Sequence, residues 1–432
     1  MTFPFGSPSA VALLTLAVLV AAACGSEDVP KWKSERVPEV DERGWVPDQP
    51  GLFGFRRPPA APPASIGEIG YAPGTEVAPG VTGVLEYDRE RAFDGLNLMC
   101  SGDVAAAELA SMTGEVLHRW AFPYRRLPDA PELEGPHQTP WRRVHLLEDG
   151  SLLAIHSGRA LVCVDVASNL RWVSFERAHH DLDVAPDGTI HALARRERVV
   201  PAIDENRPLV DDFVLLLNAS GDAVARVSLW DAFGRSRWAF MLDHLTVRQG
   251  DVMHANSIRR IDAETAARLG LEGVEAGQVL VCMRDLDLVV TVDLDAKVLT
   301  WLTQGPSGDG WRAPHDPTIT AQGDLLIFDN RGGPGETSRL LRMDPETREV
   351  AWSWRGSPPE SFASFFCGTA RQLPNGNVLA TESTQGRAIE LDAETGEIVW
   401  EFVSDRVTGP DDSYVAALFE VQRVTRPGWL ER

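Results

Sequence analysis

Four side chains in this sequence carry useful chemistry and stand at related positions: His180, His254, Arg284 and His315. His180 and His315 each precede the glycine of a predicted hairpin turn by eight residues, and His254 begins a strand ahead of another hairpin. Arg284 follows the next strand of the repeat unit that contains His254. Imidazole and guanidinium groups bind the oxygens of sulfuryl and phosphoryl groups, and an imidazole can act as a nucleophile. These residue types therefore predict a site for transfer of an oxyanion group.

The eight-residue distance identifies a further candidate, Arg142. The residues eight positions before Gly150, Gly188, Gly323 and Gly376 are, in that order, Arg142, His180, His315 and Gly368. Arg142 either contributes to the same pocket or forms a salt bridge at its rim. The distance favours His180 over its neighbour His179. We expect the other histidines to be structural or to lie at the surface: His137, His145, His156, His191 and His244.

The elements that must position these residues follow from a repeat. A polar turn, a β-branched run and a tryptophan recur six times, ending at Trp120, Trp172, Trp230, Trp301, Trp352 and Trp400. A second pattern, a strand, a turn ending in glycine and another apolar strand, predicts hairpins. Six units of about four strands, with tryptophans between neighbouring sheets, predict an all-β, six-bladed β-propeller. A pair of β-sandwiches is the alternative, but it does not explain six matched tryptophans.

Two other segments refine this prediction. "DAETAARLGLEG" (262–273) predicts a short helix inside an insertion, and "SYVAALFEVQRV" (413–424) predicts a strand that completes a blade and closes the ring. The first strand of each propeller blade lines the central channel. We therefore expect the histidines and Arg284 to converge near the axis of the propeller.

Three histidines also suit Zn²⁺, which accepts neutral imidazole ligands. Against this, Arg284 would repel the cation, and the only carboxylates in register, Asp181 and Asp316, directly follow a histidine. Consecutive side chains of a strand point to opposite faces, so we expect these aspartates to point away from the channel. A histidine at a strand start is often only a satisfied polar residue, but matched positions favour a common site. The sequence favours a site without metal or cofactor.

The N-terminal residues predict export. An apolar stretch too short to span a membrane as a helix is followed by small residues and Cys24. We expect a signal peptide over 1–24 with lipidation of Cys24, a proline-rich linker over 25–85, and the propeller over 86–432. Such a protein would be a periplasmic or outer-membrane lipoprotein that contacts the membrane only through its lipid anchor.

Charge and cysteine content limit the partners and the covalent structure. A formal net charge of −22 disfavours binding to nucleic acid, so an anionic small substrate would need a locally positive pocket. Besides Cys24 there are four cysteines, for which one or two disulfides or buried free thiols are alternatives. The sequence does not choose a pairing.

Several motifs resemble those of bacterial aryl-sulfate sulfotransferases over roughly residues 140–405. They include "HHDLDVAPDGTI", "HANSI", "VLVCMRDLDLVVTVD", "PHDPTITAQGDLLIFDNRG" and the Ser338-Arg339 pair. The resemblance implies a six-bladed propeller that transfers a sulfuryl group from an aryl sulfate to a phenol without a nucleotide sulfate donor. It also implies a ping-pong cycle through a sulfohistidine.

The resemblance implies a role for each site residue. His315 would be the nucleophile that is transiently sulfated. His254 and Arg284 would bind and polarise the sulfuryl oxygens, and His180 would give acid or base help to the phenol oxygen. Asn256 would orient His254 or bind the sulfuryl group, with a turn-forming role as the alternative.

Departures from the family pattern leave other interpretations open. The proline-rich segment stands where studied members carry a β domain that helps them dimerise, so we expect a monomer. A non-catalytic exported lipoprotein propeller that binds a small ligand or a partner protein is the competing hypothesis, and a quinone-dependent dehydrogenase is a more distant one. The sequence identifies neither the donor nor the acceptor.

Overall fold

The computed structural model describes residues 74–133, 139–245, 248, 250–307 and 310–431. These residues belong to the second of two compact units of the chain, Trp32–Arg432. The predicted signal peptide with Cys24, most of the predicted linker and His137 lie outside the described residues. Within the described ranges, no helix has both the length and the apolar character needed to cross a membrane.

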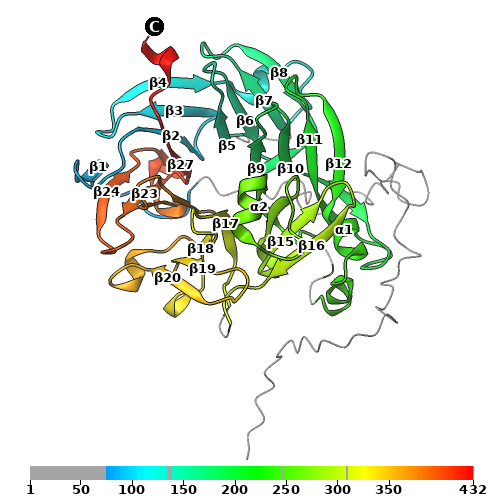
Figure 1. The fold of residues 1–432 in the computed structure, drawn as a ribbon. Helices are drawn as coiled ribbons and strands as arrows, with labels where there is room; N and C mark the ends of the chain where they lie inside the picture. The colour runs from blue at the N-terminus through cyan, green and yellow to red at the C-terminus, as the bar shows by residue number, and fades with distance from the viewer. Residues whose placement is uncertain (1–73, 134–138, 246–247, 249, 308–309, 432) are drawn as a thin grey trace, which may run out of the picture. The chain divides into compact units, whose positions relative to one another are not determined.

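Six antiparallel sheets form the blades of a β-propeller, which confirms the predicted fold (Figure 1). Blade 1 contains β27 (Leu418–Val424), β2 (Leu96–Ser101), β3 (Ala106–Ala110) and β4 (Val116–Ala121). Blade 2 contains β5 (Trp141–Leu146), β6 (Leu152–His156), β7 (Ala160–Val164) and β8 (Leu170–Ser174). Blade 3 contains β9 (Ala178–Val184), β10 (Ile190–Val199), β11 (Pro208–Leu217) and β12 (Ala223–Ser228).

The other three blades repeat this order. Blade 4 contains β13 (Ala255–Arg260), β14 (Val279–Met283), β15 (Leu288–Asp293) and β16 (Val298–Thr303). Blade 5 contains β17 (Pro314–Ile319), β18 (Leu325–Asp329), β19 (Arg339–Met343) and β20 (Val350–Trp354). Blade 6 contains β21 (Thr369–Gln372), β22 (Val378–Glu382), β23 (Arg387–Leu391), β24 (Ile398–Val403) and β1 (Gly83–Tyr87). A separate ribbon pairs β25 (Val407–Thr408) with β26 (Tyr414–Val415).

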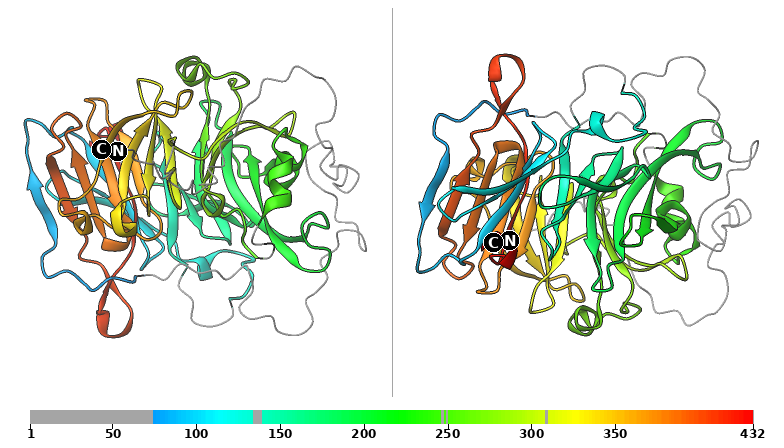
Figure 2. Two further views of the ribbon diagram at one scale, coloured as in Figure 1. Left: turned by 90° about the horizontal axis from the view of Figure 1, so that it is seen from below. Right: turned by 90° about the horizontal axis from the view of Figure 1, so that it is seen from above.

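Both ends of the described chain contribute to closure of the ring. β27 supplies the innermost strand of blade 1, as predicted from "SYVAALFEVQRV". β1 adds an outer fifth strand to blade 6 beside β24, and Figure 2 shows the blue β1 next to the orange β24 from above and below. β1 begins at Gly83, within the last residues of the segment expected to be a linker. Closure pairs inner strand edges that would otherwise be exposed.

Five of the six repeated tryptophans lie on the outermost of the four repeated strands of their blade. Several join neighbouring blades: Trp120 Nε1 donates to the carbonyl oxygen of Gly150 in the next blade at 3.0 Å. Trp400 Nε1 likewise donates to Met112, which carries the contact from blade 6 back to blade 1. The sixth, Trp230, differs from the predicted strand end. It lies in α1 (Leu229–Arg235), because β12 ends at Ser228, whose side chain caps the helix by accepting from the Asp231 amide.

Two further predictions concern local structure. The expected helix is present as α2 (Ala263–Leu269), in the insertion between β13 and β14, with Asp262 as its N-cap. The four cysteines of the described residues are buried free thiols: Cys100, Cys163, Cys282 and Cys367. The free-thiol alternative is therefore the one that the structure supports.

The apolar core lies between neighbouring sheets. Leu153 and Ile155 of β6, for example, pack in one cluster with Phe213 and Leu215 of β11. Because the inner strands are covered on both faces, their polar side chains meet at the axis of the propeller and not in solvent.

Candidate active site

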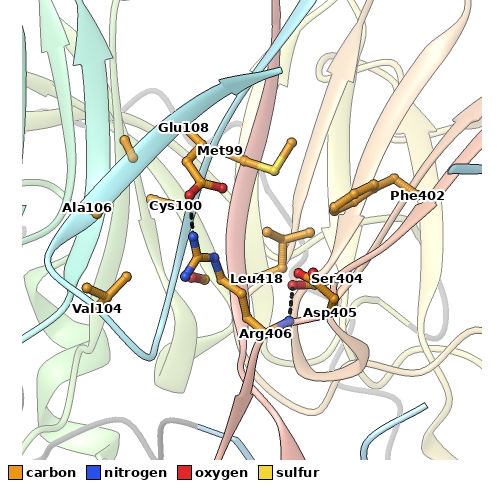
Figure 3. Close-up of a pocket in the computed structure, with 12 residues that line it drawn as sticks. Met99, Cys100, Val104, Ala106, Glu108, Phe402, Ser404, Asp405, Arg406 and Leu418 are labelled. Atoms are coloured by element: carbon orange, nitrogen blue, oxygen red, sulfur yellow. Dashed lines mark hydrogen bonds and ion pairs between the residues drawn. The ribbon is translucent and has the colours of Figure 1, made fainter. Parts of the chain in front are cut away.

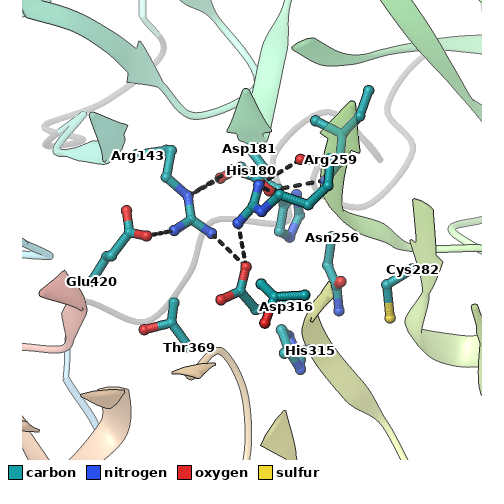
Figure 4. A network of polar contacts seen from close by, with 12 residues as sticks. Arg143, His180, Asp181, Asn256, Arg259, Cys282, His315, Asp316, Thr369 and Glu420 are labelled. Carbon is teal, nitrogen blue, oxygen red and sulfur yellow. Dashed lines mark hydrogen bonds and ion pairs between the residues drawn. The ribbon is translucent and has the colours of Figure 1, made fainter. Parts of the chain in front are cut away.

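Six charged residues alternate in sign around the axis, one from the innermost strand of each blade, and Figure 4 labels all of them except Arg371. In blade order 2, 3, 4, 5, 6 and 1 they are Arg143, Asp181, Arg259, Asp316, Arg371 and Glu420. We call this set the axial ring. Opposite charges on adjacent inner strands attract across blade boundaries, so the ring ties all six blades together.

Short contacts connect the members of the axial ring. Arg143 Nε lies 2.9 Å from Asp181 Oδ1, and Arg259 lies 2.5 Å from both Asp181 and Asp316. Arg371 is 3.0 Å from Asp316, and Glu420 pairs with both Arg143 and Arg371. Burial by itself would raise the pKa of Glu420, but the two arginines lower it to about 2. The carboxylate is therefore ionised at neutral pH.

The position of Asp181 and Asp316 corrects a prediction. They were expected to point away from the channel by simple strand alternation, yet both lie in the axial ring (Figure 4). The alternation fails because His180 and Asp316 have φ values of 55° and 52°, and because the pairing of β17 with β18 shifts register after His315. A positive φ re-aims the side chain and the rest of the strand.

The three predicted histidines lie beside this ring. The rings of His180 and His254 are 5.0 Å apart between centroids. Burial lowers the pKa of His315 well below its ordinary value, and the nearby Arg284, His254 and Arg142 lower it further. The structure thus brings His180, His254, His315 and Arg284 into one electrostatically coupled cluster.

Hydrogen bonds determine which nitrogen of His315 carries its proton. Nδ1 lies 2.7 Å from Asn330 Oδ1 and 3.1 Å from the carbonyl oxygen of Ala313. A carbonyl oxygen only accepts, so Nδ1 is the protonated nitrogen. The amide of Cys367 donates to Nε2 at 3.2 Å, which requires a lone pair there. His315 is therefore a neutral imidazole whose basic nitrogen is Nε2.

Asn330 is itself held in one orientation. Its Nδ2 donates to the carbonyl oxygens of Ser364 and Cys367 at 2.6 and 2.7 Å. Exchange of the amide oxygen and nitrogen would place Oδ1 against two carbonyl oxygens, which repel it. Asn330 therefore connects both sides of the His315 ring, directly at Nδ1 and through the Cys367 segment at Nε2.

The other predicted site residues are also placed. His254 Nδ1 lies 2.7 Å from Asp251, and Arg284 Nη1 lies 2.8 Å from Asp285. Burial alone would raise the pKa of Asp251, but the hydrogen bond and charge of His254 bring it below its ordinary value. Asn256 donates through Nδ2 to Pro314, while its buried Oδ1 has no hydrogen-bond partner among the described residues.

Arg142 is buried. Its guanidinium carbon lies 4.6 Å from the centre of the Phe419 ring, and its Nη2 is 3.3 Å from the sulfur of Cys367. Because the amide of Cys367 also contacts His315, Arg142 places a positive charge close to the His315 ring.

Some residues of the cluster were missed by sequence reasoning. The offset rule preferred His180 to His179, but His179 is equally buried, and its Nδ1 lies 2.6 Å from that of His180. Asp212 and Asp251, the partners of His179 and His254, carried no signal in the sequence. Asn330 belongs to the "DN" of the quoted "PHDP" motif, which was the available signal.

A separate small cavity, of about 30 Å³, lies between blades 1 and 6 (Figure 3). Its lining includes Cys100, Glu108, Phe402 and Arg406, and Arg406 forms an ion pair with Glu108 across it. At this volume it accommodates about one water molecule. It does not include the histidine cluster.

Comparisons with known proteins complete this description. A search of curated proteins found no match. Among solved structures, a protein of unknown function from Bacteroides caccae is 13% identical, with a TM-score of 0.47 over 76% of this chain and 98% of its own. A streptogramin B lyase is 9% identical, with a TM-score of 0.42 over 77% and 87%. At these TM-scores the likenesses support no conclusion about this chain.

A family model supplies the assignment. The model described as Arylsulfotransferase (ASST) matches residues 147–405. This range contains His180, His254, Arg284 and His315, together with their partners Asp251 and Asn330. Because the match extends over more than half of the chain, the protein belongs to the arylsulfotransferase family.

Proposed function

We propose that this protein transfers a sulfuryl group from an aryl sulfate to a phenol in two half-reactions, through a covalent intermediate on His315. The observation that carries the proposal is the state of His315: a buried, neutral imidazole with its proton held on Nδ1 and its lone pair on Nε2. A nucleophile must be unprotonated to attack, and the lowered pKa keeps it so at neutral pH.

In the first half-reaction, Nε2 of His315 gives up its hydrogen bond from the Cys367 amide and attacks the sulfur of the aryl sulfate with the freed lone pair. The bond between sulfur and the phenolic oxygen breaks, and the departing phenolate takes the proton that His180 holds from the preceding acceptor half-reaction. His254 and Arg284 bind the sulfuryl oxygens, whose negative charge they offset in the transition state. Asn256 Oδ1 is a buried acceptor without a hydrogen-bond partner among the described residues, which suits the hydroxyl of the acceptor phenol in the second half-reaction. The proton stays on Nδ1 of His315, hydrogen-bonded to Asn330, so the sulfated ring carries a positive charge. Because the ring becomes neutral when the bond between sulfur and Nε2 breaks, Nε2 is a good leaving group.

In the second half-reaction, the oxygen of an acceptor phenol attacks the same sulfur. The bond between sulfur and Nε2 breaks and returns His315 to its neutral form, while His180 accepts the phenol proton. No nucleotide sulfate is needed, because the high-energy bond comes from the aryl ester itself. Arg284 and Arg142 near His315 give the pocket a locally positive charge, which accounts for how a protein of net charge −22 receives an anionic substrate.

Export extends the proposal to the place of action. We place the enzyme in the periplasm or at the outer membrane, anchored through a lipid on Cys24, with the linker between anchor and propeller. The support is the apolar stretch and the small residues before Cys24. Metabolic labelling with a fatty acid analogue tests this: the wild type incorporates label, and Cys24→Ala does not. A labelled Cys24→Ala protein would contradict the anchor.

The test of the proposed reaction is a donor screen with chromogenic aryl sulfates, with and without added phenol. Wild type should release the chromophore, and the rate should rise with an acceptor. Intact-protein mass spectrometry after incubation with donor alone should show one added SO₃ group, mapped to His315. His315→Ala should lose both signals, whereas His145→Ala should keep them. Chromophore release without an adduct would contradict the covalent intermediate, and a protein inactive with every donor would favour a binding propeller.

A further inference from the structure

His179 and His180 face each other although they are consecutive residues of β9. Their Nδ1 atoms are 2.6 Å apart, and their rings meet edge to face with centroids 4.8 Å apart. Consecutive strand residues normally point to opposite faces. Here the φ of 55° at His180 turns both side chains to the same side, where both are buried. A contact of this kind between two imidazoles requires a proton between the two nitrogens.

The position of that proton follows from Asp212. Its Oδ1 lies 3.2 Å from His179 Nε2, a close polar contact outside hydrogen-bond geometry, and its Oδ2 accepts from the Ala255 amide at 2.8 Å. A negative carboxylate at this distance favours a proton on His179 Nε2 over a lone pair. Burial lowers the pKa of His179, which keeps the ring neutral and leaves a lone pair on its Nδ1. The shared proton therefore belongs to Nδ1 of His180, and Nε2 of His180 is the basic nitrogen.

Several charged groups surround this chain of contacts. His179 is close to Asp212 of β11, Arg195 of β10 and Asp251, which precedes β13. His180 has four cationic or titratable neighbours: His254, Arg195, His315 and Arg284. Burial and these neighbours lower the pKa of His180 well below its ordinary value. His180 is therefore neutral when the acceptor phenol binds to the sulfated enzyme, and Asp212 is the carboxylate that can offset its charge while it holds the accepted proton until the next donor binds.

We propose that His179 and Asp212 are positioning residues that hold His180 as its Nδ1–H tautomer and stabilise its protonated form during sulfuryl transfer. This inference rests on the proposed function. In the acceptor half-reaction, Nε2 of His180 takes the phenol proton while the phenol oxygen bonds to sulfur and the bond between sulfur and His315 breaks. The resulting imidazolium donates from its Nδ1 to Nδ1 of His179, and the Asp212 carboxylate beside His179 Nε2 offsets the positive charge. In the next donor half-reaction the proton passes from Nε2 to the departing phenolate.

The proposal predicts a loss that depends on the leaving group. His179→Leu should lower kcat about 100-fold for donors whose phenol is weakly acidic, because their departing oxygen needs a proton. Donors with strongly acidic nitrophenols leave as stable anions, so their kcat should change little, and KM should stay within about threefold for both classes. His179→Asn retains an acceptor near His180 Nδ1 and should recover part of the loss. Asp212→Asn should resemble His179→Leu in direction.

His191→Gln is the matched control, because His191 is a buried histidine of the same blade outside this chain of contacts. It should show no dependence on the leaving group. An equal loss for all donors in His179→Leu, or the same dependence in His191→Gln, would overturn the proposal. Near-ultraviolet circular dichroism checks that each variant is folded. If His179→Leu does not fold, His179→Asn takes its place as the test variant.

A readout without substrate separates this inference from the proposed function. In ¹⁵N-histidine-labelled protein, NMR should show His180 protonated on Nδ1 in the wild type and a mixture of tautomers in His179→Leu. If this change occurs in a protein that transfers no sulfuryl group, the positioning stands and the proposed reaction fails. If the protein is active but the His180 tautomer is the same in both proteins, the positioning role is overturned.

Discussion

The chemistry of the site depends on which nitrogen of each imidazole carries a proton. For His315, three groups agree: Ala313 and Asn330 accept at Nδ1, and the Cys367 amide donates at Nε2. Asn330 also holds the segment that contains Cys367 through two donated hydrogen bonds. One amide side chain therefore orients both the His315 imidazole and the backbone amide that faces its Nε2.

At this scale we predict the effect of Asn330→Leu. The variant keeps the volume but loses the acceptor at Nδ1 and both bonds to the Cys367 segment, so kcat should fall about 100-fold while KM changes little. Steady-state kinetics with one aryl sulfate measures this. Asn377→Leu is the matched control, because Asn377 is a buried amide of blade 6 that donates to Glu390 and Arg91. Equal losses in both variants would contradict the role of Asn330.

The dependence of activity on pH on the acid side follows from the protonation of His315. The pKa of His315 is lowered by burial and by Arg284, so the imidazole is neutral above that lowered pKa and charged only below it. Activity that requires neutral His315 should stay constant as the pH falls through 6.5, the ordinary pKa of histidine, and decline only at lower pH. The rate of enzyme sulfation, measured in single-turnover experiments, tests this. A midpoint at or above the ordinary value would contradict the assignment.

At the scale of elements, short irregular segments at the strand ends position the reactive groups. Cys367 and Gly368, which precede β21, have φ values of 61° and 109°. A Cβ atom on Gly368 would lie 2.7 Å from the ring of Phe328 in β18. The turn that aims the Cys367 amide at His315 therefore requires glycine for both its backbone conformation and its close packing.

Gly368→Ala should show both requirements. We expect backbone strain and displacement of Phe328 to destabilise the protein by about 3 kcal/mol and to lower kcat, because the Cys367 amide moves. Gly376→Ala is the control, because Gly376 has a φ of 92° but no atom within 4 Å of an added Cβ. Gly376→Ala should lower the free energy of unfolding by about half as much as Gly368→Ala, and it should leave kcat unchanged. Urea unfolding and kinetics measure the two effects, and equal stability losses would contradict the packing argument.

At the scale of the whole molecule, the axial ring and the terminal strands join the six blades. Each inner strand contributes one charge, and each charge contacts a neighbour of opposite sign. Glu420 belongs to β27, the strand from the C-terminal end that completes blade 1. Closure of the propeller therefore combines main-chain pairing at β27 with electrostatic contacts to Arg143 and Arg371.

The axial ring predicts a pH-dependent stability. The pKa of Glu420 is about 2 in the folded protein, below its ordinary 4.5, so its contribution is complete above pH 4.5 and is lost as the pH falls toward 2. Glu420→Gln should lower the free energy of unfolding by about 3 kcal/mol at pH 7, with a difference that shrinks below pH 4.5. Glu397→Gln, at an exposed ion pair with Arg91, should change it by less than about 1 kcal/mol. A pH-independent difference for Glu420→Gln would contradict this account.

Much of the architecture was predictable because it depends on local patterns. The turn glycines and five of the six tryptophans mark the blades, since hairpin turns and outer strands require these residues wherever they occur. Their regular spacing also placed His180 and His315 at equivalent strand starts, and the C-terminal apolar run predicted the closing strand. Trp230 was the exception, because Ser228 and Asp231 cap a helix where the repeat suggested a strand end.

The detailed site was decided by the tertiary structure. The contact of His315 with Cys367 joins residues 52 positions apart, and that of Asp181 with Arg259 joins residues 78 apart. No local period encodes such pairings, because they arise only when neighbouring blades pack. The positive φ values at His180 and Asp316 also cancel the strand alternation on which side-chain directions were predicted. The sequence by itself thus determined the six blades and the candidate residues at the axis, whereas packing at the axis determined the tautomers, the axial ring and the place of His179.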